Sequence, residues 1–248
     1  NVMKILYETY GIVEEDFISA EIEIVPAGGP RDVGFDRSMI GAYGHDDRVC
    51  AYPALTAIFE TSLPKRTCAC ILTDKEEIGS VGSTGLQGKF FENIVSEIYN
   101  LEQPSYSELG VKRAMANSCV LSMDVSSAYD PSFPEAFEKG NSAIMGAGVV
   151  LEKYTGARGK SGSNDAHSEY MYQLRRLFSD NGVVYQTGEL GRVDQGGGGT
   201  VAYMLANYGA YTVDFGVAVL SMHAPFELIS KADLYTAYQG AKAFYGMA

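Results

Sequence analysis

Four short segments of this sequence gather carboxylate and imidazole side chains that could bind a metal ion. The segments are His45-Asp46-Asp47, Glu76-Glu77, Asp124 and His223. The first three follow or lie near predicted strand ends, where α/β folds place their sites. The neighbours Glu76 and Glu77 point different ways from an extended backbone, so one can bind a metal while the other takes a proton from water. Metal-assisted hydrolysis needs this division, because the ion lowers the pKa of its bound water and a base completes the deprotonation.

Each segment also has a purely structural interpretation, and the residues alone leave both open. A bare Glu-Glu pair is more often a solvated acidic turn, and an acid at a helix start, such as Asp46, is often a cap or a partner of the helix dipole. Asp124 can cap the following turn, and a lone histidine is more often hydrogen-bonded than a ligand. The chain has three histidines, which excludes a histidine-rich zinc site but allows a mixed carboxylate and imidazole site.

Strands and helices alternate in the hydrophobic pattern, which predicts an α/β layered sheet with helices on both faces. The expected strands cover residues 18–25, 67–72, 118–123, 148–151, 183–186 and 212–219. The expected helices cover residues 3–9, 47–59, 90–99, 165–179 and 231–247, the last with Ser230 as its N-cap. The glycine run Gly196–Gly199 lacks the lysine of a phosphate loop and predicts a tight turn with close backbone approach.

Composition narrows the class of protein. Acidic residues outnumber basic ones by 31 to 19, giving a net charge of −12, which argues against a nucleic-acid partner. No stretch approaches the roughly 20 apolar residues that cross a bilayer, so no membrane partner is expected. The four cysteines lack a disulfide-scaffold pattern and predict reduced thiols in a cytoplasmic protein. No export signal is visible, although a chain that opens on Asn1 rather than Met can be a fragment.

Five motifs in order carry a resemblance to a known family. GHDDRVCAYPAL, DKEEIGSVGSTG, SMDVSSAYDP, DQGGGGTVAYML and SMHAPFE together resemble the motif series of the M18 metallopeptidases, the family of aspartyl aminopeptidase and aminopeptidase I. Each motif alone is weak evidence for the family, whereas the order and spacing of all five are specific to it. The resemblance runs from about residue 16 to the C-terminus and implies a three-layer sandwich around a central mixed sheet, the zinc-peptidase fold.

The resemblance also implies a chemistry and a role for each motif residue. Two zinc ions are expected, with cobalt or manganese as alternatives for the same ligand set. By motif, Asp46 resembles the bridging carboxylate, Glu77 and Asp124 resemble ligands of one zinc each, and His223 resembles the closing imidazole. Glu76 matches the general base, which passes a proton to the leaving amine as an N-terminal residue is removed from a peptide. A homo-oligomer built from dimers, with a dodecamer as the family's larger assembly, is the expected state. The segment TGARGKSGSND, which contains Arg158 and Lys160, resembles a stretch near the family's substrate pocket. A segment of this composition is more commonly a solvated loop.

One departure from the family pattern shapes the domain prediction. The family carries a further zinc-binding histidine in a His-x-Asp motif well before the bridging aspartate, and no room for it exists before Asp46. His45 is no substitute, because neighbouring side chains point apart. Residues 1–36 resemble the tail of the family's inserted dimerisation domain, and residues 37–248 are expected to be the C-terminal part of the catalytic domain. Metal binding by this chain alone is expected to be weak or limited to one ion.

Two other functions compete with the aminopeptidase hypothesis. A non-catalytic relative with an assembly role is suggested by the missing histidine, but retention of Glu76 and the four ligands weighs against it. Another di-zinc amidohydrolase, such as a carboxypeptidase or deacylase, could use the same ligands, but the M18-like residues of the motifs weigh against it.

Overall fold

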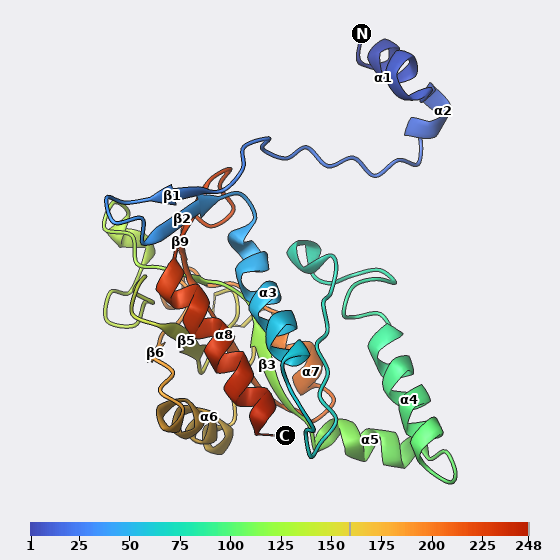
Figure 1. The fold of residues 1–248 in the computed structure, drawn as a ribbon, viewed down its shortest axis with the longest axis vertical. Coiled ribbons are helices and arrows are strands. Elements are labelled where there is room, and N and C mark those ends of the chain that lie inside the picture. The colour runs from blue at the N-terminus through green and yellow to red at the C-terminus, as the bar shows by residue number, and fades with distance from the viewer. Residues whose placement is uncertain (159, 248) are drawn as a thin grey trace.

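A thin N-terminal arm precedes the main body of the molecule (Figure 1). The computed structural model describes residues 1–158 and 160–247. Helix α1 (Val2–Tyr10), which was predicted over residues 3–9, ends where Gly11 takes a left-handed φ of 74° and is followed by α2 (Glu14–Phe17). The strand predicted over residues 18–25 is wrong: residues 20–30 are extended but unpaired and exposed. The alternating pattern makes such a segment competent to pair, but no other strand of the described residues runs beside it.

A four-stranded mixed sheet forms the centre of the body. Its order is β3 (Cys119–Met123), β7 (Tyr211–Gly216), β5 (Val149–Glu152) and β6 (Tyr185–Thr187). The pairs β3–β7 and β5–β6 are parallel, and β5–β7 is antiparallel. All four residues of β5 are buried, which explains its continuous apolar sequence. The predicted mixed sheet is therefore confirmed.

Helices on one face of this sheet enclose the hydrophobic core. These are α3 (His45–Phe59), α6 (Ser168–Asp180) and α8 (Lys231–Gly246), of which α3 and α8 run side by side (Figure 1). Phe215 of β7 packs on Phe178 of α6, with ring centroids 5.4 Å apart, and both are buried. The opposite face carries α7 (Ala202–Ala206) and loops, so the expected three layers are confirmed.

A second sheet, which the sequence did not predict, lies at the end of the body that carries the arm (Figure 1). Its order is β1 (Arg31–Val33), β2 (Met39–Ala42), β9 (Glu227–Ser230), β8 (Ala218–Leu220) and β4 (Ser126–Ser127). The single strand predicted over residues 212–219 is in fact split at Val217 between β7 and β8. This sheet matters for function because β2 leads into the start of α3, and the β8–β9 turn carries His223.

The segment between α3 and β3 departs most from the prediction. The strand expected over residues 67–72 is wrong, since no ladder forms there and Leu72 is 57% exposed. Cys68 and Cys70 are nevertheless both partly buried between exposed neighbours, the alternation that was predicted. An extended segment becomes a strand only when a neighbouring strand takes its backbone hydrogen bonds, and the described residues supply none here.

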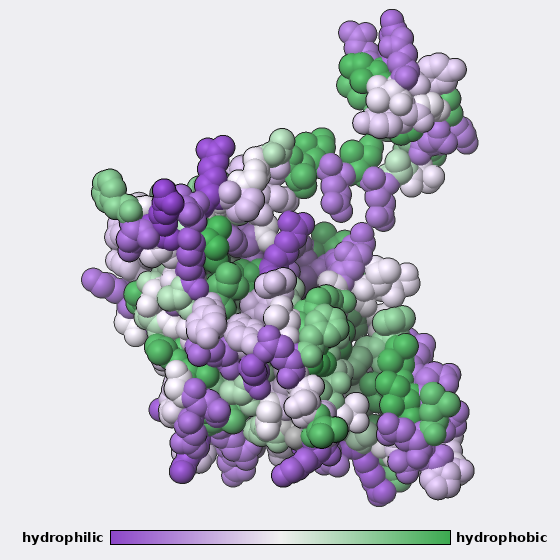
Figure 2. Space-filling view, viewed as in Figure 1, coloured by the Kyte–Doolittle hydropathy of each residue, from purple (hydrophilic) through white to green (hydrophobic). Residues whose placement is uncertain are grey.

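Short helices complete the body. They are the 3₁₀ turns η1 (Glu76–Ile78) and η2 (Pro134–Ala136) and the helices α4 (Phe90–Glu102) and α5 (Glu108–Ala116). Apolar side chains gather over α4 (Figure 2), where Phe90 and Leu101 are 70% and 82% exposed. Within residues 1–158 and 160–247, no helix combines the length and apolar character needed to cross a membrane.

Candidate metal centre

Three of the five predicted site residues meet at one point. His223 Nε2 lies 2.9 Å from Asp46 Oδ2 and 3.3 Å from Glu77 Oε1. One ligand atom from each of these residues falls within 4.8 Å of the other two. Asp46 is largely buried, whereas Glu77 and His223 remain open to solvent. Three segments that are far apart in the sequence thus present two carboxylates and one imidazole to the same small volume.

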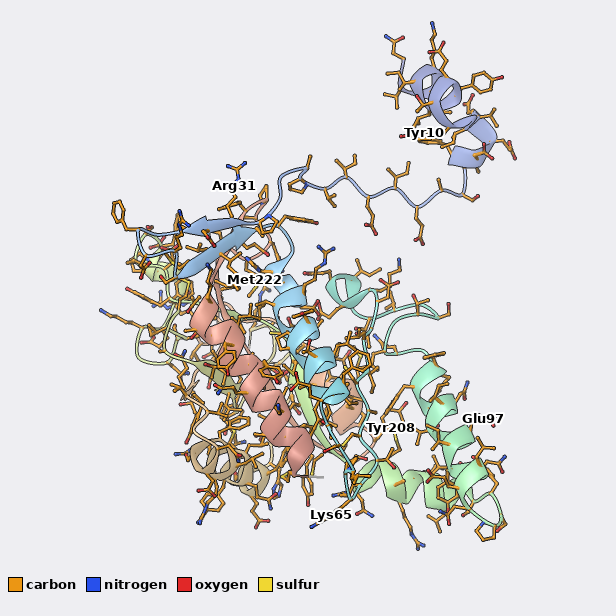
Figure 3. The ribbon with its side chains drawn as sticks, viewed as in Figure 1. Tyr10, Arg31, Lys65, Glu97, Tyr208 and Met222 are labelled. Carbon is orange, nitrogen blue, oxygen red and sulfur yellow. The ribbon has the colours of Figure 1, made fainter. Side chains whose placement is uncertain are left out.

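Irregular backbone positions Asp46 and His223. Gly44 precedes α3 with a φ of 77°, and Asp46 and Asp47 have non-helical angles, so the regular helix begins one residue later than the helix predicted over residues 47–59. His223 has a φ of 65°, which is uncommon for a residue with a side chain. Its turn closes with a hydrogen bond from Ala224 N to Ser221 O. Figure 3 shows Met222, the residue before His223, beside the start of α3.

The Glu76-Glu77 pair lies on a tightly tied turn. Ser80 N donates to Lys75 O at 2.7 Å, and the Gln87 side chain donates to Gly79 O at 2.7 Å. Gly85 is required because a Cβ there would lie 2.2 Å from Ser80 O. The predicted extended backbone is wrong, since η1 is a 3₁₀ turn, yet the side chains still diverge. Glu77 faces His223, while Glu76 lines a different hollow.

That second hollow is an apolar cavity of about 290 Å³ between the segment of residues 66–73, β3 and the end of α8. Its polar lining includes Glu76, Asp47 and Asp124. Asp124 follows β3 directly, and its Oδ1 accepts a hydrogen bond from Val125 N at 2.7 Å. Among the described residues, Asp124 and Glu76 therefore stand beside the close cluster of Asp46, Glu77 and His223 rather than within it.

Burial and mutual repulsion raise the pKa values of four acids in this region. Burial, reinforced by Glu77, raises the pKa of Asp46 to about 7, against the opposing effect of His223. Burial also raises the pKa of Asp47, and raises that of Asp124 well above its usual value with the help of Asp46 and Glu76. The pKa of Glu76 is raised by burial and then by the charges of Glu77 and Asp47. An elevated pKa of this kind suits a carboxylate that must take a proton and release it.

This donor set fits zinc. Carboxylate oxygens and imidazole nitrogen are ligands that Zn²⁺ accepts, and a dication would relieve the repulsion that raises these pKa values. Sequence reasoning gave no role to Glu227, which lines the same hollow as Asp46, Glu77 and His223. The only signal was a carboxylate four residues after His223 in SMHAPFE. Asp47, which the sequence analysis named in the same segment as Asp46 without giving it a role, lines both hollows.

The glycine run approaches another loop, as its composition predicted. Gly156 N donates to Gly198 O and Arg158 N donates to Gly196 O, each at 2.8 Å. A Cβ on Gly197 would lie 2.4 Å from Gly156 O, so this approach needs glycine. Arg158 and Lys160 are exposed on the loop that the run supports.

Comparisons with known proteins show the family of this chain. The family profile "Aminopeptidase I zinc metalloprotease (M18)" matches residues 1–245. A probable M18 family aminopeptidase 1 of Clostridium acetobutylicum is 58% identical over 98% of this chain and 52% of its own length. Its namesake from Thermotoga maritima is 48% identical over 96% of this chain and 52% of its own length.

Solved structures give the same result. The aminopeptidase I of Clostridium acetobutylicum superposes with a TM-score of 0.89 at 56% identity, covering 98% of this chain and 52% of that one. The M18 aminopeptidase of Thermotoga maritima superposes with a TM-score of 0.94 at 46% identity, covering 99% and 54%. The chain thus spans about half the length of the relatives it matches. From the profile match, the sequence identities and the shared fold, the chain belongs to the M18 family of zinc metallo-aminopeptidases.

Proposed function

We propose that this chain is the part of a zinc-dependent aminopeptidase that carries the general base Glu76 and the zinc ligands Asp46, Glu77, Asp124 and His223. The observation that carries the proposal is the meeting of Asp46, Glu77 and His223 within 4.8 Å. Asp124 is assigned as a ligand because it lines the same cavity as Glu76 and because the charges of Asp46 and Glu76 help to raise its pKa. We assign two zinc ions, with cobalt or manganese as substitutes.

Bound zinc would polarise the scissile carbonyl and lower the pKa of a bound water. Each residue of the chain then has a separate task. Asp46, held at the irregular start of α3, would help to hold the zinc with its largely buried carboxylate. Glu76 faces the apolar cavity instead of the cluster, which leaves its oxygens free to accept a proton from water and donate it to the leaving amine. Burial and the charges of Glu77 and Asp47 raise the pKa of Glu76, which makes its carboxylate a stronger base than an exposed glutamate.

The proposal includes a domain assignment. Residues 1–36 are the tail of an inserted dimerisation domain, and residues 37–248 are the C-terminal part of the catalytic domain. Support comes from the match to about half of each relative, from the edge of β3 that pairs with no other described strand, and from the cavity beside it. The exposed apolar side chains on α4 (Figure 2) also suit a surface that more of the domain covers. The family's further zinc-binding histidine would come from the remainder of the catalytic domain.

Peptides with a free amino terminus are the proposed substrates, in the cytoplasm, and a homo-oligomer built from dimers is the proposed assembly. A relative described as the S. cerevisiae mApe1 dodecamer is 23% identical, so its likeness extends to the fold, and a dodecamer is only proposed for this protein.

Activity of the full-length protein on paired substrates tests this function. Aminoacyl substrates with free and with blocked amino groups should be compared before and after chelation and after zinc is restored. We expect hydrolysis of the free-amino substrates only, lost on chelation and recovered with zinc. Cleavage confined to blocked substrates would identify a different amidohydrolase. Absence of hydrolysis in a zinc-loaded, folded protein would point to the assembly role.

A further inference from the structure

Glu227 is a buried carboxylate that connects two of the ligand-bearing loops. It is the first residue of β9, is 2% exposed, and pairs in register with Ala42, the last residue of β2. Its Oε2 accepts a hydrogen bond from Asp46 N at 3.1 Å, and its Oε1 accepts one from His223 N at 2.9 Å. Both carboxylate oxygens are therefore engaged by backbone donors.

The two donors belong to residues whose side chains face each other. Asp46 and Glu227 are 181 positions apart in the chain, yet this contact brings the start of α3 to the β8–β9 turn. On the other side of the carboxylate, His223 and Asp46 approach to 2.9 Å through their side chains. A closed ring of contacts thus runs from Glu227 through both backbones to the pair of ligand atoms.

The backbone of His223 needs such support. Its φ of 65° is a left-handed conformation that is strained for a residue with a side chain and persists only where the surroundings enforce it. Ser221, two residues earlier, has a φ of 59°. A buried charged acceptor forms a stronger hydrogen bond to an N–H than a neutral one, so Glu227 is well placed to hold this turn.

We propose that Glu227 is a positioning residue that sets the distance between the metal ligands Asp46 and His223 by fixing their backbones. The inference rests on the proposed zinc function for its consequence, but the contact itself does not depend on a bound ion. Outer partners of metal ligands commonly change metal affinity or activity by 10–100-fold when they are removed.

The chain offers a matched control for the experiment. Asp233 is 1% exposed, and its carboxylate also accepts two backbone N–H bonds, from Gly146 N at 2.6 Å and Gly148 N at 2.9 Å. It does not line either hollow of the site. Glu227→Gln and Asp233→Asn both replace one such carboxylate by an amide of nearly equal size, with one acceptor oxygen lost. Glu227→Asp keeps the charge but shortens the side chain. It therefore distinguishes the effect of side-chain length from the effect of charge.

Zinc affinity and amide exchange should be measured on the full-length protein and these three variants. Competition with a chromophoric chelator gives the affinity, and hydrogen–deuterium exchange of the metal-free protein reports on the amides of Asp46 and His223. We expect Glu227→Gln and Glu227→Asp to lower zinc affinity by about 10–100-fold and to expose one or both amides. Asp233→Asn should alter exchange around Gly146 and Gly148 and leave zinc affinity within about 2-fold of wild type.

Two results would overturn the inference: unchanged zinc affinity in both Glu227 variants, or unchanged protection of both amides. If Glu227→Gln does not fold, Glu227→Asp decides. A loss of zinc affinity as large in Asp233→Asn would also count against it, because any buried carboxylate would then have the same effect. A wild-type protein that binds no zinc would end the proposed function, while amide exchange would still show whether Glu227 holds the two loops.

Discussion

Replacing Asp46 with Asn should stabilise the metal-free protein at alkaline pH while removing its response to zinc. Asp46 is largely buried beside other acids, and its pKa is raised from 3.8 to about 7, first by burial and then by Glu77. Asn keeps the shape and an acceptor oxygen for His223 but carries no charge. The substitution therefore removes an ionised group that the folded state disfavours in the absence of a cation.

The sign and size follow from linkage. A group whose pKa is raised in the folded state contributes stability below its unfolded pKa, and this contribution is lost as pH rises through the folded pKa. Each pKa unit corresponds to about 1.4 kcal/mol, so the shift of roughly 3 units sets a ceiling of about 4 kcal/mol on the penalty above pH 7. Between pH 5 and pH 8, roughly 2 of those units are titrated. The advantage of Asp46→Asn over wild type should accordingly grow by about 3 kcal/mol over this interval.

Urea unfolding in the presence of a chelator, at pH 5 and at pH 8, measures this change for both proteins. Adding zinc at pH 8 should then stabilise the wild type, because an ion that binds only the folded state adds to its stability, and should leave Asp46→Asn unchanged. A difference between the two proteins that stays constant from pH 5 to pH 8 would refute the electrostatic reasoning. A variant that is less stable than wild type at pH 8 without metal would refute it as well.

Two further substitutions test the scaffold. Gly216→Ala should lower the free energy of unfolding by more than about 3 kcal/mol and reduce zinc retention. The reason is that a Cβ at Gly216 would lie 1.5 Å from Asp124 O and must displace that ligand. A free energy of unfolding within about 1 kcal/mol of wild type would contradict this. Ser230→Ala should lower the free energy of unfolding in urea by about 1 kcal/mol and leave zinc affinity unchanged. Ser230 Oγ accepts a hydrogen bond of 3.4 Å from Asp233 N at the start of α8, and the substitution removes it. An unchanged free energy of unfolding would mean that this hydrogen bond contributes little.

The elements that the sequence predicted correctly are stabilised by contacts within this chain. The apolar runs that became β3, β5 and β6 lie in one sheet, and the helix from Lys231 begins after Ser230 as predicted. Each of these elements has its hydrogen-bond partners or its packing surface within the described residues, so local pattern and tertiary structure agree.

The errors in the prediction have different physical causes. Residues 18–25 and 67–72 have strand-like patterns, but a ladder needs a second strand, which local pattern does not contain. The sheet with β2 and β9 was missed for the opposite reason, since MIGA and ELIS are short and lack a clear alternation. The close approach of Asp46, Glu77 and His223 was expected only through resemblance, because each had an ordinary structural interpretation. Glu227 was missed because a single glutamate at a strand start gives no sign that it contacts Asp46 N.

The general base is the centre of this account, and a single variant tests it most directly. Zinc content and peptide hydrolysis should be measured together in the full-length protein carrying Glu76→Gln. Because Glu76 faces the cavity and not the cluster of Asp46, Glu77 and His223, we expect zinc content equal to wild type and a fall of at least about 100-fold in kcat, with KM little changed. Wild-type kcat at full zinc loading would contradict the assignment of Glu76 as the base, and loss of zinc would show that it is a ligand.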